Sequence, residues 1–164
     1  MPGILLIPHA EHTPIDRSLL GHDDFVRLSE AGRAQARALV NQLVGEPIVC
    51  IQSSPRLRCL ETADALAEAL DLPVMIEPAL SEGNTGVDAQ ARVCKHLEDT
   101  RRRYRNGDVV MITHVEIIRA ALLRFGGGLP HDWRGFDIPP ASIIRLELEP
   151  LRNQRPLLSS GMHP

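Results

Sequence analysis

Near its N-terminus the chain reads ILLIPHAEHT over residues 4–13. The four apolar residues Ile4 to Ile7 lie between a glycine and a proline, and an unbroken apolar run of this kind is typical of a short strand buried on both faces of a sheet. Such a strand would deliver His9 to a loop at its carboxyl end. In open α/β sheets ligands bind at that edge, so His9 is the first candidate for a functional residue.

Strands and helices alternate along the rest of the chain. We expect four further strands, over Ile48–Ile51, Leu72–Ile76, Val109–Ile112 and Ser142–Leu148. We also expect four helices: one opened by Leu28–Gly32 and ended by Gly45, one starting at Ser54 and Pro55, and two over Asp88–Tyr104 and Ile117–Phe125. The segments from Glu11 to Phe25 and from Glu77 to Gly86 are expected to be loops. This alternation predicts an α/β fold, a three-layer α/β/α sandwich around a mostly parallel sheet.

Two of these helices carry clear start signals. Ser29 is a good N-cap for the first, and Ser54 as the N-cap with Pro55 at the first helical position marks the second. Arg56 and Arg58 then lie in its first turn, where a cation opposes the helix dipole at a cost of roughly a few tenths of a kcal/mol. An anion bound nearby would explain this placement of Arg58.

Composition and charge argue against several classes of function. Aromatic residues make up only 3% of the chain and the net charge is −3, which is atypical of nucleic-acid binding. The three cysteines are odd in number and widely spaced, which argues against a disulfide framework or a zinc ribbon and favours a reducing cytoplasm. No run approaches the roughly 18 apolar residues of a membrane span and no export signal is apparent, so we expect no membrane partner.

The length of 164 residues fits one domain. We assign this domain to residues 1–149. Residues 150–164 show no pattern and are a candidate for a disordered tail. Nothing in the sequence indicates an oligomeric state.

Charged and polar residues follow several of the predicted strands. His9 and His114 each come directly after a buried apolar strand, and Arg58 opens the helix after another, so all three can meet at one edge of the sheet. Glu82 can reach the same edge from a loop. Phosphoryl transfer through a phosphohistidine needs this set, because one imidazole attacks phosphorus, cations hold the phosphoryl oxygens and a carboxylic acid protonates the departing oxygen.

Five segments carry motifs of a known kind. They are Pro8-His9-Ala10-Glu11-His12, the run LSEAGRAQA from Leu28 to Ala36, the run SSPRLRCLETA from Ser53 to Ala63, Leu80-Ser81-Glu82 and Ile112-Thr113-His114. Together they resemble the histidine phosphatase superfamily, also called the phosphoglycerate mutase-like or branch-1 histidine phosphatases. The family usually has Arg-His-Gly-Glu-Thr at the first segment and Ser-Ser-Pro-x-x-Arg-x-x-x-Thr-Ala at the third. The resemblance spans roughly residues 3–148, nearly the whole chain.

The resemblance implies a phosphatase that forms a phosphohistidine on His9. It assigns phosphoryl binding to Arg58 and His114 together with His9, and the role of general acid to Glu82. Weaker candidates for this acid are Glu11 and Glu116. It implies that the protein needs no cofactor and no metal. The partner that it implies is a phosphorylated small molecule or a phosphoprotein. The chain is short for the glycolytic mutases of the family, so it is more similar to the small phosphatases.

The sequence departs from the family pattern inside the expected pocket. Pro8 stands where the family has its first phosphate-binding arginine, and this loss is expected to cost on the order of 10² to 10³ in rate unless another cation replaces it. Ala10 and Val115 stand where glycines follow the two histidines, and the β-branched Val115 would resist a positive φ. Candidates for the replacement cation are Arg17, His12, His22 and Arg56.

Three hypotheses stay open. The first is a working phosphatase for phosphomonoesters or phosphoproteins, slowed by Pro8. The second is a catalytically impaired member of the family that binds a phosphorylated ligand or partner without turnover. The third is a metal-binding protein that uses His9, His12 and His114 with Glu11, since imidazole suits zinc and similar ions.

Overall fold

A computed structural model of the chain describes residues 2–15, 23–83, 87–125 and 137–148. In chain order the elements are β1 (Ile4–Pro8), η1 (Asp23–Phe25), α1 (Glu30–Leu43), β2 (Ile48–Ser53), α2 (Leu57–Leu70), β3 (Val74–Ile76), η2 (Pro78–Leu80), α3 (Val87–Arg103), β4 (Asp108–Thr113), α4 (Val115–Phe125) and β5 (Ile144–Leu146). The two η elements are short 3-10 helices. None of the helices in this part of the chain has the length and apolar character of a membrane span.

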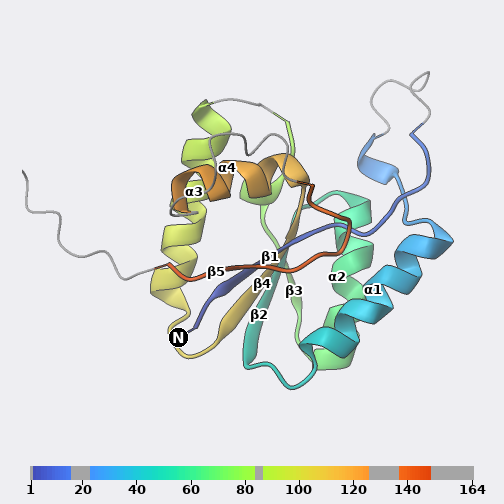
Figure 1. Cartoon of the computed structure of the whole chain (residues 1–164), viewed down its shortest axis with the longest axis horizontal. Coiled ribbons are helices and arrows are strands. Elements are labelled where there is room, and N and C mark those ends of the chain that lie inside the picture. The colour runs from blue at the N-terminus through green and yellow to red at the C-terminus, as the bar shows by residue number, and fades with distance from the viewer. Residues whose placement is uncertain (1, 16–22, 84–86, 126–136, 149–164) are drawn as a thin grey trace, which may run out of the picture.

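The strands form one sheet in the order β3-β2-β4-β1-β5. β1 pairs in parallel with β4, from Ile4 opposite Val109 to Pro8 opposite Thr113, and β2 pairs in parallel with both β4 and β3. β5 runs antiparallel to β1 at one edge of the sheet. Because β1, β2 and β4 point the same way, the residues that follow them meet at one end of the sheet, as the sequence predicted (Figure 1).

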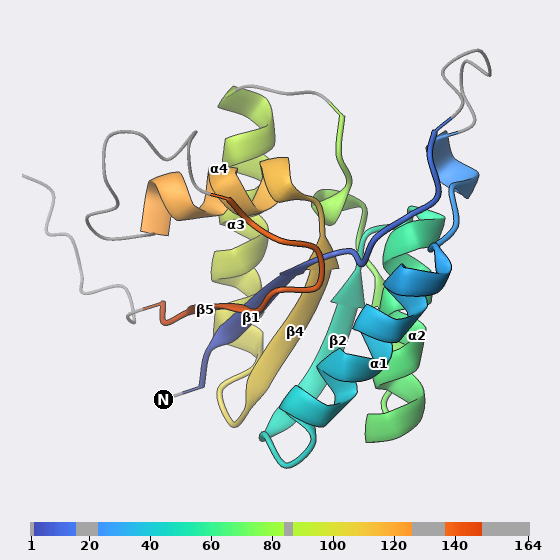
Figure 2. The same ribbon diagram turned by 45° about the vertical axis from the view of Figure 1, so that its right-hand side comes forward.

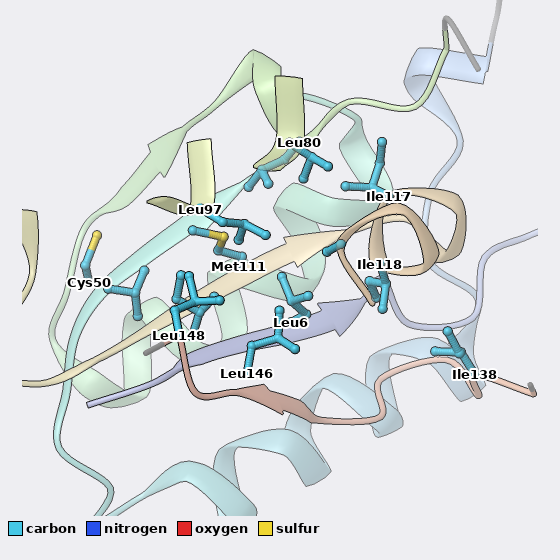
Figure 3. Packing of buried hydrophobic residues seen from close by; sticks show 14 residues of the cluster. Leu6, Cys50, Leu80, Leu97, Met111, Ile117, Ile118, Ile138, Leu146 and Leu148 are labelled. Carbon is cyan, nitrogen blue, oxygen red and sulfur yellow. The ribbon is translucent and has the colours of Figure 1, made fainter. Parts of the chain in front are cut away.

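Helices cover both faces of the sheet, which confirms the predicted three-layer sandwich. Figure 2 shows α1 and α2 on one face and α3 and α4 on the other. Leu5 and Ile7 of β1 pack in the apolar cluster under α1 and α2, whereas Ile4 and Leu6 pack in the cluster under α3 and α4. Figure 3 shows Leu6 among the side chains of this second cluster. Each of these four side chains is at most 1% exposed, and burial of each contributes about 1.5–3 kcal/mol.

A buried carboxylate joins three strands at the end of the sheet opposite the histidines. Asp108, the first residue of β4, is 2% exposed, and one of its oxygens accepts a hydrogen bond from the Gly3 backbone N–H at 2.6 Å. Its other oxygen accepts from Arg145 of β5 at 2.7 Å. The edge strand β5 is therefore tied to the starts of β1 and β4 by a single side chain.

The structure corrects the predicted start of the second helix. α2 begins at Leu57 with Arg56 as its N-cap, rather than at Ser54 and Pro55. The Ser54 hydroxyl accepts from the Arg56 backbone N–H at 3.4 Å, and it also has a long-range partner, the Nε2 atom of His114 at 2.9 Å.

Other bounds differ by a few residues. α4 begins at Val115, before the predicted Ile117, and both β3 and β5 are shorter than predicted. The predicted loop over residues 77–86 contains the short helix η2. Leu80, its last residue, is fully buried and anchors this segment to the core. Residue 149, the predicted end of the domain, and the predicted tail over residues 150–164 lie outside the described residues.

The start of α1 follows its sequence signals. Ser29 is the N-cap, and its hydroxyl accepts a hydrogen bond from the Gly32 backbone N–H at 3.0 Å. The Ser29 backbone N–H donates to the Glu11 carbonyl at 3.0 Å, so the loop after β1 is held against this helix end. A Cβ on Gly32 would overlap the same carbonyl, which means that only glycine permits the contact.

We predict that Gly32→Ala lowers the free energy of unfolding by about 1–3 kcal/mol, because the added methyl group would push Glu11 away from α1. At an open helical position the same change would instead stabilise the protein by about 0.5–1 kcal/mol. Urea unfolding followed by circular dichroism measures the difference. Arg33→Ala, an exposed position in the same turn, is the control and should stay within about 0.5 kcal/mol of wild type. A Gly32→Ala protein as stable as wild type would contradict the contact.

Candidate active site

His9 and His114 lie side by side at the carboxyl ends of β1 and β4. Their ring centroids are 5.4 Å apart and the ring planes are inclined by 65°. His114 is 1% exposed and His9 is half-buried, so the second imidazole lies deep and the first is nearer to solvent. The His9 backbone N–H donates to the Thr113 carbonyl at 2.9 Å, which extends the pairing of β1 with β4 up to the two histidines.

The His9 ring is oriented by the neighbouring main chain. Its Nδ1 lies 2.9 Å from the Ala10 carbonyl oxygen, which can only accept, so Nδ1 carries the proton and Nε2 keeps its lone pair. Burial lowers the pKa of His9 from 6.5 to about 4; the hydrogen bond to Ala10 opposes this change, and the Arg58 charge adds to it. At neutral pH His9 is therefore a neutral imidazole with one nucleophilic nitrogen.

A serine hydroxyl and a carboxylate flank His114. Ser54 Oγ lies 2.9 Å from its Nε2, and Glu82 Oε2 lies 3.3 Å from its Nδ1. An ionised carboxylate can only accept a hydrogen bond, so we assign the ring proton of His114 to Nδ1, the nitrogen that faces Glu82. Nε2 then carries the lone pair and accepts a hydrogen bond from the Ser54 hydroxyl. Burial lowers the pKa of His114 to about 3, and the positive charges of Arg58 and Arg56 act in the same direction.

Arg58 supplies a buried cation to the same place. It lies in the first turn of α2 and is 3% exposed, and its Nη2 forms an ion pair with Glu82 Oε1. Arg56, at the N-cap of this helix, has its Nε 3.9 Å from that oxygen. The Thr113 hydroxyl donates to the Leu80 carbonyl at 2.7 Å and ties the segment that carries Glu82 to β4. The carboxylate therefore lies among two guanidinium groups and an imidazole.

Thr62 holds the loop after His9 in place, a role that the sequence did not indicate. Its hydroxyl accepts from the Ala10 backbone N–H at 3.0 Å and donates to the Arg58 carbonyl at 2.8 Å. It thus links the loop of the first histidine to the helix turn that carries Arg58. The available signal was its position in the Ser53–Ala63 motif, four residues after Arg58, because residues one turn apart share a helix face.

Pro8 is accommodated at the end of β1. It is buried, and it lies beyond the pairing of β1 with β5, which ends at Leu6 opposite Ile144. The N–H that proline lacks therefore interrupts no pairing between these strands. The Pro8 carbonyl still accepts a hydrogen bond from the Ala141 backbone N–H at 3.1 Å.

The two residues that replace glycines need no glycine conformation. In the described part of the chain, the non-glycine residues with positive φ are Asp71 and Ala141. Val115 starts α4 directly after the second histidine, and Ala10 is 0% exposed in a small apolar cluster. Their side chains therefore introduce no backbone strain into the site.

The other candidate carboxylates lie further from the centre of the site. Glu11 Oε1 accepts from the Ser29 hydroxyl at 2.8 Å, which directs this side chain towards α1. Glu116 is exposed in the first turn of α4, where its charge acts on His9 from a distance. Glu82 is the carboxylate that contacts both Arg58 and the second histidine.

The remaining candidate cations and the metal hypothesis depend on the loop after β1. The His12 ring is centred 5.4 Å from that of His9, while Arg17 and His22 lie outside the described residues. Among the residues that are described, no group of three or more His, Cys, Asp or Glu side chains is arranged to hold a metal ion.

The sequence matches the family described as Histidine phosphatase superfamily (branch 1) over residues 4–87 and 81–158. A phosphoserine phosphatase 1 from Hydrogenobacter thermophilus is 30% identical over 191 residues, covering 90% of this chain and 88% of that protein. An 8-oxo-(d)GTP phosphatase from Mycolicibacterium smegmatis is 34% identical over 116 residues, covering 70% of this chain. The chain spans only 34% of the length of that second relative.

The fold is similar to that of a solved phosphatase. The crystal structure of a phosphoserine phosphatase from Entamoeba histolytica, in complex with 3-phosphoglyceric acid, matches with a TM-score of 0.72. The match has 21% sequence identity and covers 88% of this chain and 90% of that chain. The observed sheet and its four helices therefore have the phosphoglycerate mutase-like arrangement that the sequence predicted.

We predict that the folded state loses stability as the pH falls from about 6.5 to about 4. Burial lowers the pKa of His9 to about 4 and that of His114 to about 3, so the unfolded chain binds more protons over this range. Each histidine then contributes a loss of up to about 1.4 kcal/mol per pH unit. Urea unfolding at several pH values measures the slope, which should be shallower for His114→Gln than for wild type. Equal slopes would argue against a neutral, buried His114.

Proposed function

The chain belongs to branch 1 of the histidine phosphatase superfamily, and from that membership we propose that it hydrolyses phosphomonoesters through a phosphohistidine formed on His9. Relatives that are named as phosphatases support phosphatase activity in general. The observation that supports the residue roles is the convergence of two imidazoles, those of His9 and His114, with the buried guanidinium of Arg58. This set offers a nucleophile and two donors to one phosphoryl group.

In the proposed complex the phosphoryl group of the substrate takes over the contacts now made by the Glu82 carboxylate. Its oxygens accept hydrogen bonds from Arg58 and from the Nδ1–H of His114, the two groups that face Glu82 in the structure. Both donors are at most 3% exposed, and hydrogen bonds to charged groups are strongest where water is excluded. Substrate binding therefore moves Glu82 towards the leaving group.

The first chemical step is an attack of His9 Nε2 on phosphorus. A P–N bond forms while the bond from phosphorus to the leaving oxygen breaks, and Glu82 gives its proton to that oxygen so that the alcohol leaves neutral. The negative phosphoryl group beside Glu82 favours the protonated form that this role requires.

The second step returns the enzyme to its starting state. Water attacks the phosphohistidine, and the Glu82 carboxylate takes the proton of that water. The P–N bond breaks, inorganic phosphate leaves and His9 is again a neutral imidazole.

A phosphorylated small molecule is the proposed substrate. A relative named phosphoserine phosphatase, and a structure of similar fold in complex with 3-phosphoglyceric acid, support this class. A phosphoprotein is the alternative, because His9 is half-buried and an exposed phosphorylated side chain could reach it. The free thiols of the three cysteines suit a reducing compartment, so we propose that the activity is cytoplasmic.

A phosphate-binding protein without turnover is the second candidate function, and Pro8 is the observation that favours it. Proline offers neither a side-chain donor nor a backbone N–H at the position where the family pattern has an arginine. Such a protein would still hold a phosphorylated ligand through Arg58 and His114 but would stabilise the transition state poorly. The two candidates differ in whether phosphate release depends on His9.

We predict that the wild-type protein releases phosphate from an aryl phosphate such as para-nitrophenyl phosphate, and that His9→Ala lowers kcat by at least about 10³-fold because the nucleophile is lost. His96→Ala is the matched control, since it removes a half-buried imidazole on α3 instead. The release of para-nitrophenol is followed by its absorbance. Equal rates for wild type and His9→Ala would rule out the proposed phosphatase.

We predict that Pro8→Arg raises kcat/KM for the same aryl phosphate by about tenfold or more, because an added guanidinium stabilises the charge that develops in the transition state. Circular dichroism and the melting temperature establish that this variant folds as the wild type does. If Pro8→Arg tightened phosphate binding but neither protein turned the substrate over, the second candidate function would be favoured.

A further inference from the structure

We propose that Arg56 binds the phosphoryl group of the substrate and so replaces the arginine that the family pattern has at position 8. This inference rests on the proposed function, because it names a further phosphate-binding residue of the same site. Arg56 is the N-cap residue of α2, two positions before Arg58, and therefore comes to the site from another strand end than residue 8.

One carboxylate oxygen already lies close to both guanidinium groups. Glu82 Oε1 forms an ion pair with Arg58 Nη2 and lies 3.9 Å from Arg56 Nε. The other oxygen of this carboxylate lies 3.3 Å from His114 Nδ1. A phosphoryl group in the same position presents three oxygens where the carboxylate has two, so it can engage Arg56 without giving up Arg58 or His114.

The Arg56 side chain lies beside the Glu82 carboxylate and still has an N–H donor to offer. Its side chain is 24% exposed, and its Nε is buried and makes no hydrogen bond within the described residues. Its Nη1 forms an ion pair with Asp24 of η1, whose side chain is 54% exposed. A pair this exposed is weak, so the guanidinium can exchange Asp24 for a phosphoryl oxygen at little cost.

Arg56 fits the role better than His12, the other candidate cation among the described residues. A guanidinium is always charged and presents a planar fork of donors that matches phosphate oxygens. The Nδ1 atom of His12 lies 2.7 Å from the Thr13 carbonyl oxygen, so only its other ring nitrogen is left to contact a ligand. The charge of Arg56 also reaches the centre of the site, because it adds to burial in lowering the pKa of His114.

Binding of inorganic phosphate tests the inference without requiring turnover. In isothermal titration calorimetry, Arg56→Ala should weaken phosphate binding by about tenfold or more, because it removes a charge-assisted contact. Asp24→Asn should act in the opposite direction and tighten binding about two- to fivefold, since it releases Arg56 from its ion pair. Arg37→Ala removes the same charge from an exposed position of α1 and should leave the affinity unchanged.

The Pro8→Arg substitution provides a second, independent test. If the arginines at positions 8 and 56 serve the same phosphoryl group, their effects on kcat/KM for an aryl phosphate are not additive. Pro8→Arg should therefore increase kcat/KM about tenfold more in the Arg56→Ala background than in the wild type. Should Arg56→Ala fail to fold, Arg56→Lys and Arg56→Gln replace it. Lysine keeps the charge but not the fork of donors, so phosphate should bind more weakly to Arg56→Lys than to wild type and more weakly still to Arg56→Gln.

The outcomes separate the two proposals. If wild type binds phosphate, Arg58→Ala abolishes that binding and Arg56→Ala leaves it unchanged, the role of Arg56 is overturned while the proposed function stands. The same conclusion follows if the effects of Pro8→Arg and Arg56→Ala are additive. If wild type neither binds phosphate nor releases it from the aryl ester, the proposed function fails and the role of Arg56 falls with it.

Discussion

The parallel pairing of β1 with β4 is the interaction on which the rest of the structure depends. Its register sets Pro8 opposite Thr113, so the next residue of each strand is a histidine and the two rings meet at 5.4 Å. The pairing is stable because both strands are apolar and buried under helices on both faces. A shift of one residue would turn the alternating side chains to the wrong faces and separate His9 from His114.

Burial of this pair determines the electrostatics of the site. Taking the imidazoles out of water lowers the pKa values of His9 and His114, so both are neutral at pH 7 and available for nucleophilic attack or hydrogen bonding. The buried guanidinium of Arg58 keeps its charge and needs an anion, and Glu82 supplies one. Glu82 therefore lies against Arg58 and His114, the two donors that the proposed function assigns to the phosphoryl group.

The departure at position 8 changes the charge of the site without changing the fold. Pro8 is the last residue of β1 and lies beyond the residues paired with β5, so the sheet does not need an N–H there. At this position the proposed phosphate site lacks the arginine of the family pattern. We propose that Arg56 offsets this loss, because the N-cap of α2 places its guanidinium 3.9 Å from the Glu82 oxygen that pairs with Arg58.

The sequence by itself determined the layers of the fold and the end of the sheet at which His9 and His114 lie, because apolar runs and helical spacings are local patterns that fix how each segment is buried. The tertiary structure alone decided which side chains complete the site. Ser54 has the local signature of a helix cap, yet its hydroxyl pairs with His114, 60 positions away. Likewise, the carboxylate of Glu82 meets Arg58 only because the chain folds back between them. Contacts of this kind join residues that are far apart in the sequence, so a local sequence pattern cannot predict them.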